Sequence, residues 1–254
     1  MTDLAADAAL AAVLVREAGR LAHRMRADGL TAELKTSVSD IVTAADRAAE
    51  RLIVQRLAEE RPHDAVVGEE GTNRPGSSGR SWIIDPVDGT YNFHSGLSWW
   101  CSALALTDPD DVLLGAVYHP HDDALFVGGP DLPSARNGEA MSTLVDVPLA
   151  RTCATTYLHP PFDHDVFAAF ERAAGAAATL RMLGSGTMDA MAIAQGQLGV
   201  SFQHSVADWD RLPGAAIIRG VGGEARQVSS GGVVWSVAGA PTAVAQACAA
   251  LEGR

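Results

Sequence analysis

The stretch SWIIDPVDGTYNFHSG, residues 81–96, ends an apolar run on one carboxylate and places a second carboxylate three residues later. The run Trp-Ile-Ile predicts a buried strand that stops at Asp85. The proline that follows cannot donate a ladder hydrogen bond, so the backbone must turn and bring Asp88 round toward Asp85. Gly89 and Thr90 come next, and their backbone N–H groups could cradle an anion.

Acids follow apolar segments at two further places. Glu69 and Glu70 end the strand-like run DAVVGEE, and Asp210 stands at the start of a helix in DWDRLPG. Carboxylates that lie close together raise one another's pKa, so protons or cations must offset their charge. Oxygen ligands without His or Cys favour Mg²⁺, with Mn²⁺ or Ca²⁺ as alternatives, and hard ions beside anion donors are the parts of phosphoryl hydrolysis. The competing interpretation is a simple turn in which Asp85 and Asp88 bond their own backbone.

Composition limits the class of protein. The 254 residues can bury a large core, and the net charge of −12, without any Lys/Arg block, argues against a nucleic-acid partner. Three distant cysteines without a CxxC fit a reducing cytoplasm better than a disulfide framework or a zinc site. The N-terminal segment is typical of an amphipathic helix rather than a signal peptide, and we expect no membrane span.

The order of expected elements changes part-way along the chain. A helix over residues 3–28 and a second helix precede three β-rich runs between residues 98 and 129, which predict an antiparallel meander. After Pro148 strands and helices alternate. We therefore expect an α+β lobe over residues 1–145, carrying most metal ligands, and an α/β lobe over residues 146–254, carrying Asp210 and substrate contacts.

The segment WIIDPVDGTYNF closely resembles the signature of the inositol monophosphatase family, which are Mg²⁺-dependent, lithium-sensitive phosphatases. The resemblance extends to KTSVSDIVTAAD at 35–46, GEE at 68–70 and WDRLPG at 209–214, in the family's order and at similar separations. Together these elements run over most of the chain and are highly specific, so the simple turn is set aside. The resemblance implies a layered α-β-α-β-α sandwich of the sugar-phosphatase type and a homodimer.

The resemblance also implies two or three Mg²⁺ ions. Asp85 would bridge the first two, and a third, weaker ion would be held largely through water. The implied ligands are Glu69, Asp85, the carbonyl of Val87, Asp88, Asp210 and, close to the third ion, Asp40.

Catalytic roles follow from the same resemblance. The backbone N–H groups of Gly89 and Thr90 would bind phosphate. Asp46 would hydrogen-bond the Thr90 hydroxyl, and Thr90 with Glu69 would orient the attacking water. The implied reaction is hydrolysis of a phosphomonoester without a covalent intermediate.

Substrate identity is the open part of the prediction. The resemblance implies substrate contacts at Asp88, Gly184, Ser185, Gly186, Gln203 and Asp210. Inositol-specific members carry a Glu at the position of Gln203, and Gln binds a hydroxyl without the strength of a charged acceptor. The best candidate is inositol-1-phosphate, hydrolysed to inositol and phosphate, with histidinol phosphate, fructose 1,6-bisphosphate and 3′-phosphoadenosine 5′-phosphate as alternatives. A non-catalytic member that binds a phosphorylated ligand or a partner is the alternative of another class.

Three smaller features have competing interpretations. HPHDD at 119–123 predicts a hairpin turn rather than a metal cluster, because it lies between two strand-like runs. HPPFDH at 159–164 favours a proline-stiffened surface loop over a substrate-reading segment. Asp208 is expected to cap the helix that carries Asp210.

Overall fold

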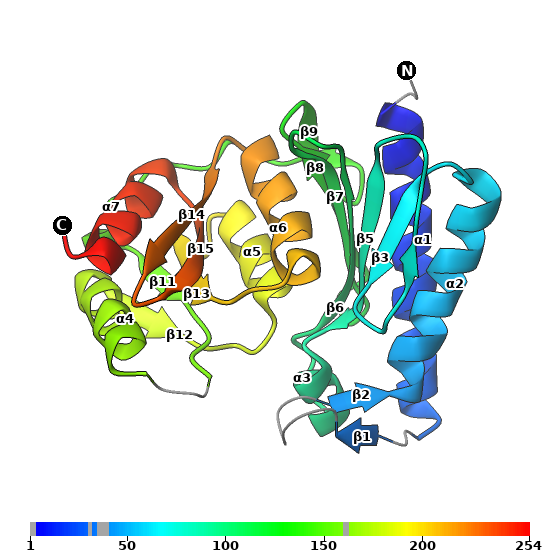
Figure 1. The fold of residues 1–254 in the computed structure, drawn as a ribbon, viewed down its shortest axis with the longest axis horizontal. Coiled ribbons are helices and arrows are strands. Elements are labelled where there is room, and N and C mark those ends of the chain that lie inside the picture. Colours follow the sequence, from blue (N-terminus) through cyan, green and yellow to red (C-terminus); the bar gives the residue numbers. More distant parts are fainter. Residues whose placement is uncertain (1–3, 30–31, 35–40, 160–162) are drawn as a thin grey trace.

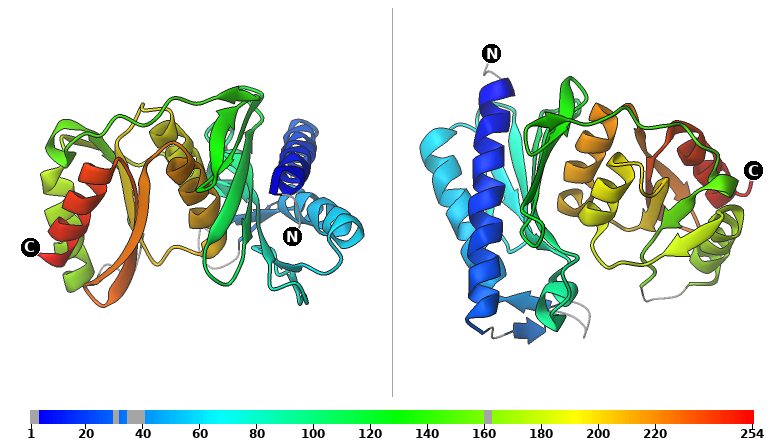
Figure 2. Two further views of the ribbon diagram at one scale, coloured as in Figure 1. Left: turned by 90° about the horizontal axis from the view of Figure 1, so that it is seen from above. Right: turned by 180° about the vertical axis from the view of Figure 1, so that it is seen from behind.

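The computed structural model of the protein describes residues 4–29, 32–34, 41–159 and 163–254. Five layers follow one another across the molecule, helices alternating with sheets, as Figure 1 and the reverse view in Figure 2 show. The outer helices on one side are α1 (Leu4–Ala27) and α2 (Ala44–Glu60), the middle ones α5 (Gly186–Ala194) and α6 (Asp208–Gly220), and the far ones α4 (His164–Ala176) and α7 (Pro241–Glu252). The layered α-β-α-β-α sandwich predicted from the resemblance is confirmed.

The first sheet holds eight strands in the described part of the chain, in the order β10-β9-β8-β7-β6-β5-β3-β4. β3 and β5 are parallel. β6, β7 and β8 form the predicted antiparallel meander, and β5, β9 and β10 extend it on its two sides. Residues 120–123 connect two of these strands, which confirms the hairpin turn in HPHDD. The strands are β3 (Ala65–Gly68), β4 (Asn73–Arg74), β5 (Ser81–Asp88), β6 (Cys101–Thr107), β7 (Val112–His119), β8 (Ala124–Gly129), β9 (Leu132–Arg136) and β10 (Glu139–Ala140).

The second sheet has the order β12-β11-β13-β15-β14 over the described residues and mixes parallel with antiparallel pairs. A short 3₁₀ helix, Leu149–Arg151, precedes it, and a small separate hairpin pairs β1 (Ala32–Leu34) with β2 (Ile41–Thr43). The strands of the second sheet are β11 (Cys153–Thr155), β12 (Thr179–Arg181), β13 (Val200–His204), β14 (Glu224–Ser230) and β15 (Val233–Gly239).

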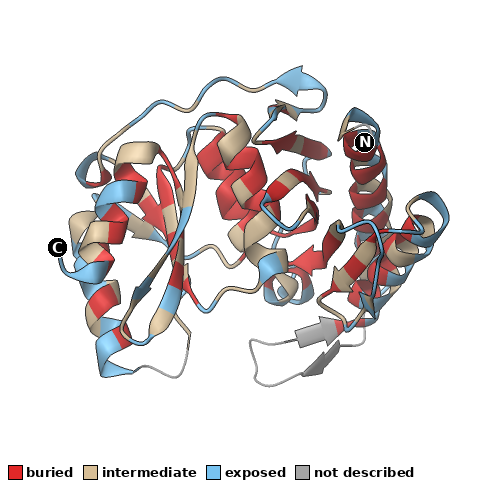
Figure 3. Cartoon of the chain, turned by 45° about the horizontal axis from the view of Figure 1, so that its top comes forward, coloured by how far each residue is buried: buried red, intermediate tan, exposed pale blue. Residues whose placement is uncertain are grey.

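The middle helices lie between the two sheets. Eight of the nine residues of α5 are buried, and so are five of the thirteen residues of α6; Figure 3 shows buried helical segments at the centre of the molecule. α6 packs against β5, β6, β7 and β8 of the first sheet and against β14 and β15 of the second. Both helices therefore carry their N-terminal residues into the space between the two sheets.

The start of α6 differs from the expectation. Ala207 is the N-cap residue, its helix begins at Asp208, and no side chain caps the end, so the prediction that Asp208 caps this helix is wrong. Arg211 lies one turn further along and donates to the Asp208 carboxylate at 2.5 Å. That ion pair draws the carboxylate away from the free N–H groups of the first turn.

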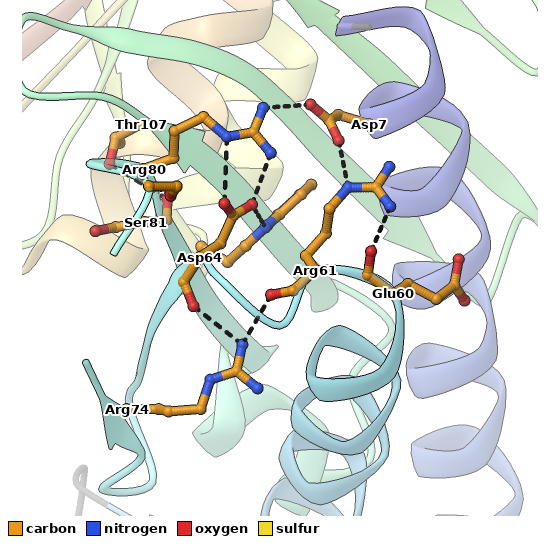
Figure 4. A network of polar contacts seen from close by, with 10 residues as sticks. Asp7, Glu60, Arg61, Asp64, Arg74, Arg80, Ser81 and Thr107 are labelled. Carbon is orange, nitrogen blue, oxygen red and sulfur yellow. Dashed lines mark hydrogen bonds and ion pairs between the residues drawn. The ribbon is translucent and has the colours of Figure 1, made fainter. Parts of the chain in front are cut away.

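A buried ionic network ties α1 to the first sheet, as Figure 4 shows. Asp7 has no exposed surface and accepts from Arg61 at 2.7 Å and from Arg80 at 2.5 Å. Arg80 also pairs with Asp64 at 2.6 Å, and the indole N–H of Trp82 donates to the same carboxylate at 2.9 Å. The network fixes the end of α2 and the start of β5, the strand that carries Asp85 and Asp88.

Candidate active site

Three carboxylates converge where β5 ends and α6 begins. One oxygen from each of Asp85, Asp88 and Asp210 lies within 4.8 Å of the other two. Asp85 and Asp88 are buried, and a register shift in the pairing of β5 with β6 falls between them. The prediction that the strand stops at Asp85 is wrong, because β5 runs on to Asp88 and still pairs there with Cys101. The register shift takes the place of the expected turn, and Asp210 reaches the two carboxylates from the first turn of α6.

Asp85 has one oxygen engaged and one without a partner. Its Oδ1 accepts from the backbone N–H of Val87 at 3.0 Å. This is the kind of local hydrogen bond expected from the simple-turn interpretation of the sequence. Its Oδ2 is buried and has no hydrogen-bond partner among the described residues. A buried unpaired carboxylate oxygen is costly, so the position fits a bound cation.

Asp88 joins the first sheet to the middle helices. Its Oδ2 accepts from the Ser185 hydroxyl at 2.9 Å and from the Thr187 backbone N–H at 2.6 Å, both at the start of α5. Gly89 has a φ of 89°, and a Cβ there would lie 3.0 Å from the Cβ of Ser185 and 3.2 Å from the carbonyl oxygen of Gly184. Only glycine allows this left-handed backbone and this close approach together.

The implied hydrogen bond between Thr90 and Asp46 is present. The Thr90 hydroxyl lies 3.2 Å from Asp46 Oδ1 and 2.9 Å from the carbonyl oxygen of Val87. Asp46 belongs to the capping box that starts α2: its Oδ2 accepts from the backbone N–H of Thr43 at 3.0 Å and from the Thr43 hydroxyl. Helix capping thus fixes the carboxylate that faces Thr90.

Burial and mutual repulsion make this a site that needs positive charge. Burial raises the pKa of Asp85 well above its ordinary value, and the charges of Glu69, Asp88 and Asp210 raise it further. Burial, followed by the charges of Asp88 and Glu69, does the same to the pKa of Asp210. Burial also raises the pKa of Asp88, against the hydrogen bonds that it accepts, and raises the pKa of Asp46 to about 6. An all-oxygen cluster of this kind suits Mg²⁺.

A cleft of about 210 Å³ opens beside the cluster. It brings together most of the residues predicted from the sequence, while Asp46, Asp85 and Val87 are buried and do not line it. Asp40, the remaining predicted ligand, lies outside the described residues. The lining consists of Glu69, Asp88, Gly89, Thr90, Tyr91, Thr156, Tyr157, Gly184, Ser185, Gly186, Asp189, Gln203 and Asp210.

Sequence reasoning missed part of this lining, notably Thr156, Tyr157 and Asp189. The one available signal was Asp189, a lone acid in the otherwise apolar helix GTMDAMAIA. Tyr157 precedes the segment 159–164, whose residues 160–162 lie outside the described part of the chain. His159, which is described, places its ring 4.5 Å from that of His204.

Comparison with known proteins identifies the family. A model of the inositol monophosphatase family matches residues 3–251. The chain belongs to that family. A protein of Thermotoga maritima named fructose-1,6-bisphosphatase/inositol-1-monophosphatase is 31% identical over 212 residues, covering 83% of this chain and 80% of its own. An inositol-1-monophosphatase of Rhizobium meliloti is 30% identical over 200 residues, covering 76% and 74%.

Solved structures agree on the fold. The extragenic suppressor protein suhB from Bartonella henselae superposes with a TM-score of 0.87 over 97% of this chain and 98% of its own, at 24% identity. Family membership makes the chain a phosphatase from a metal-dependent family that acts on small phosphorylated substrates. Within the described residues, no helix combines the length and apolar character needed to span a membrane.

Proposed function

We propose that this enzyme is a Mg²⁺-dependent phosphomonoesterase that hydrolyses a small phosphorylated polyol, with inositol-1-phosphate as the best candidate. The observation that carries the proposal is the buried cluster of Asp85, Asp88 and Asp210, in which Asp85 Oδ2 has no partner among the described residues. The cluster adjoins a cleft of a size suited to a small ester. The name of the Rhizobium meliloti relative supports the substrate.

In this proposal two or three Mg²⁺ ions are held by carboxylates and one carbonyl. When bound, Mg²⁺ would supply a more acidic water and would offset charge on the phosphoryl group and on the leaving oxygen. The residues that would hold the ions are Glu69, Asp85, the carbonyl of Val87, Asp88, Asp210 and, near the third ion, Asp40.

The remaining roles belong to the protein's own groups. The Thr90 hydroxyl has one proton and two acceptors, the carbonyl of Val87 and the carboxylate of Asp46. With Asp46 ionised above a pKa of about 6 and the Val87 carbonyl held by a metal ion, the proton would go to Asp46, and the Thr90 oxygen could accept from a water in the cleft. Glu69 lines the same cleft and would receive the water's other proton. The backbone N–H groups of Gly89 and Thr90 would bind phosphate oxygens as charge builds on them.

Assembly, inhibition and compartment are proposed on the family resemblance. We expect a homodimer that lithium inhibits and that works in the cytoplasm. The three cysteines, 101, 153 and 248, are all free thiols, which suits a reducing compartment.

A second substrate has one specific observation in its favour. The Thermotoga maritima relative carries both fructose-1,6-bisphosphatase and inositol-1-monophosphatase in its name. Fructose 1,6-bisphosphate is therefore the alternative to test beside inositol-1-phosphate.

The test is phosphate release from both esters at a fixed Mg²⁺ concentration, with and without lithium. We expect inositol-1-phosphate to be hydrolysed faster, and lithium to suppress the reaction. Asp88→Asn, which is nearly isosteric, should abolish turnover while circular dichroism shows an intact fold, and Asp165→Asn on exposed α4 is the matched control. Full activity of Asp88→Asn, or no phosphate release by the wild type from any ester, would contradict the proposal.

A further inference from the structure

The cleft beside the carboxylate cluster adjoins a second cavity of about 230 Å³ between α6 and the second sheet. The two cavities have five lining residues in common: Thr156, Gly186, Asp189, Gln203 and Asp210. These five residues form a wall shared by the two cavities. Because Asp210 also belongs to the carboxylate cluster, the shared wall lies next to the place proposed for the phosphoryl group of the substrate. This is where the alcohol portion of a bound ester would project.

Asp189 gives this wall a carboxylate that the proposed metal ligands do not include. It lies in the first turn of α5 and is only 5% exposed. The indole N–H of Trp99 donates to its Oδ1 at 2.9 Å and so fixes the orientation of the side chain. The Thr155 side chain also interacts with this carboxylate and, like Trp99, lowers its pKa. A buried carboxylate can accept more hydrogen bonds than these two side chains provide, and hydroxyl groups of a ligand in the cleft would supply them.

Thr156 adds an unpaired hydroxyl to the same wall. The residue is 4% exposed, and its backbone N–H donates to the carbonyl of Arg181 at 3.1 Å. Its Oγ1 is buried and makes no hydrogen bond to any residue in the described part of the chain. Buried hydroxyls in native proteins are nearly always paired, so this one points to a polar group of a ligand.

We infer that Thr156 and Asp189 bind hydroxyl groups of the alcohol released from the phosphate ester, and so select esters of polyhydroxylated alcohols. The inference rests on the proposed function and names the residues behind its substrate class. Trp99 acts as a positioning residue, since it holds Asp189 and does not itself line the cleft.

Charge favours a neutral polyol over a second phosphate at this wall. Asp189 would repel an anionic group, and the arginines that line the second cavity already have carboxylate partners. Arg219 donates to Asp111 at 2.6 and 2.7 Å, Arg211 to Asp208 at 2.5 Å, and Arg226 pairs with Glu224 at 2.5 Å. No lining cation is left to receive a second phosphate among the described residues.

The experiment compares two esters that differ in their alcohol. Myo-inositol 1-phosphate carries hydroxyl groups on the leaving alcohol, and 4-nitrophenyl phosphate carries none. We expect the ratio of kcat/KM for the first ester to that for the second to fall about tenfold in Asp189→Asn and in Thr156→Val, mainly through KM. Trp99→Phe should lower the ratio less, and Asp165→Asn should leave it unchanged.

An unchanged ratio in both Asp189→Asn and Thr156→Val would overturn the inference while the proposed function stands, whether the two esters keep their rates or lose them equally. A raised Mg²⁺ requirement in Asp189→Asn would also overturn it, because the residue would then act on the metals. A wild type that hydrolyses only the aryl ester refutes the polyol assignment along with the inference, and a wild type inactive on both refutes the proposed function itself.

Discussion

Asp189 carries a measurable cost in stability, because the fold buries its carboxylate. Burial raises its pKa from 3.8 to about 7, against the Trp99 hydrogen bond and with help from the charge of Asp88. A pKa that is higher in the folded state means that the protonated form contributes stability below pH 4, and that this contribution disappears as the pH rises through 7. At about 1.4 kcal/mol per pKa unit, the loss amounts to about 2 kcal/mol at pH 5 and about 4 kcal/mol at pH 8.

Asp189→Asn tests this magnitude, because Asn keeps an acceptor for Trp99 and cannot ionise. The free energy of unfolding of the metal-free proteins would be measured by urea denaturation at pH 5 and pH 8. The advantage of the variant over the wild type should grow by about 2.5 kcal/mol between the two pH values. A constant difference in packing cancels in this comparison.

The matched control is Asp110→Asn, at an exposed position of the turn between β6 and β7. Its difference from the wild type should be the same at both pH values. An Asp189→Asn difference that stays constant or shrinks as the pH rises would refute the reasoning that the fold raises this pKa. If the pH dependence and the ester comparison both give the expected results, Asp189 lowers the stability of the fold and selects the substrate.

Three further predictions concern other parts of the fold. Gly89→Ala should lower the free energy of unfolding by about 2 kcal/mol, because φ is 89° and the new Cβ would crowd the start of α5. Thermal denaturation measures the loss, and an unchanged melting temperature would contradict the expected backbone strain. Asp7→Asn should cost about 3 kcal/mol in urea denaturation, because Arg61 loses its carboxylate partner and Arg80 keeps only Asp64. A loss below about 1 kcal/mol would mean that solvent replaces the lost charge. Mg²⁺ should raise the melting temperature of the wild type, because it offsets the charge of the buried carboxylates. In scanning calorimetry Asp210→Asn should lose most of that rise, and an equal rise in both proteins would exclude Asp210 as a ligand.

The approach of Asp88 to Asp85 could be predicted because the residues that determine it are neighbours in the sequence. An apolar strand, a proline and two acids lie within eight residues, so an irregularity that brings Asp88 toward Asp85 follows from neighbouring positions. The strand end itself was misplaced, because pairing with β6 resumes at Asp88 after the register shift. The approach of Asp210 to Asp85 is different, since it depends on the packing of α6 against the first sheet. Spacing along the chain carries no information on that contact, and the family resemblance supplied it.

Thr156 and Asp189 escaped prediction for the same reason. Thr156 follows a short strand, and Asp189 lies in a helix whose other residues predict core. Only the placement of the second sheet against the middle helices puts both residues on one wall. The error at Asp208 was of another kind, because a local competitor, Arg211, took the carboxylate that was expected to cap the helix.

The most direct test of the central claim is phosphate release from myo-inositol 1-phosphate across a Mg²⁺ titration, for the wild type and for Asp85→Asn. The wild type should be inactive in chelator and should gain activity with Mg²⁺. Asp85→Asn should stay more than about a hundredfold below it at every Mg²⁺ concentration, because even the partners that only orient metal ligands commonly account for 10- to 100-fold. Undiminished release in chelator, or wild-type rates from Asp85→Asn, would contradict a catalytic metal site at this cluster.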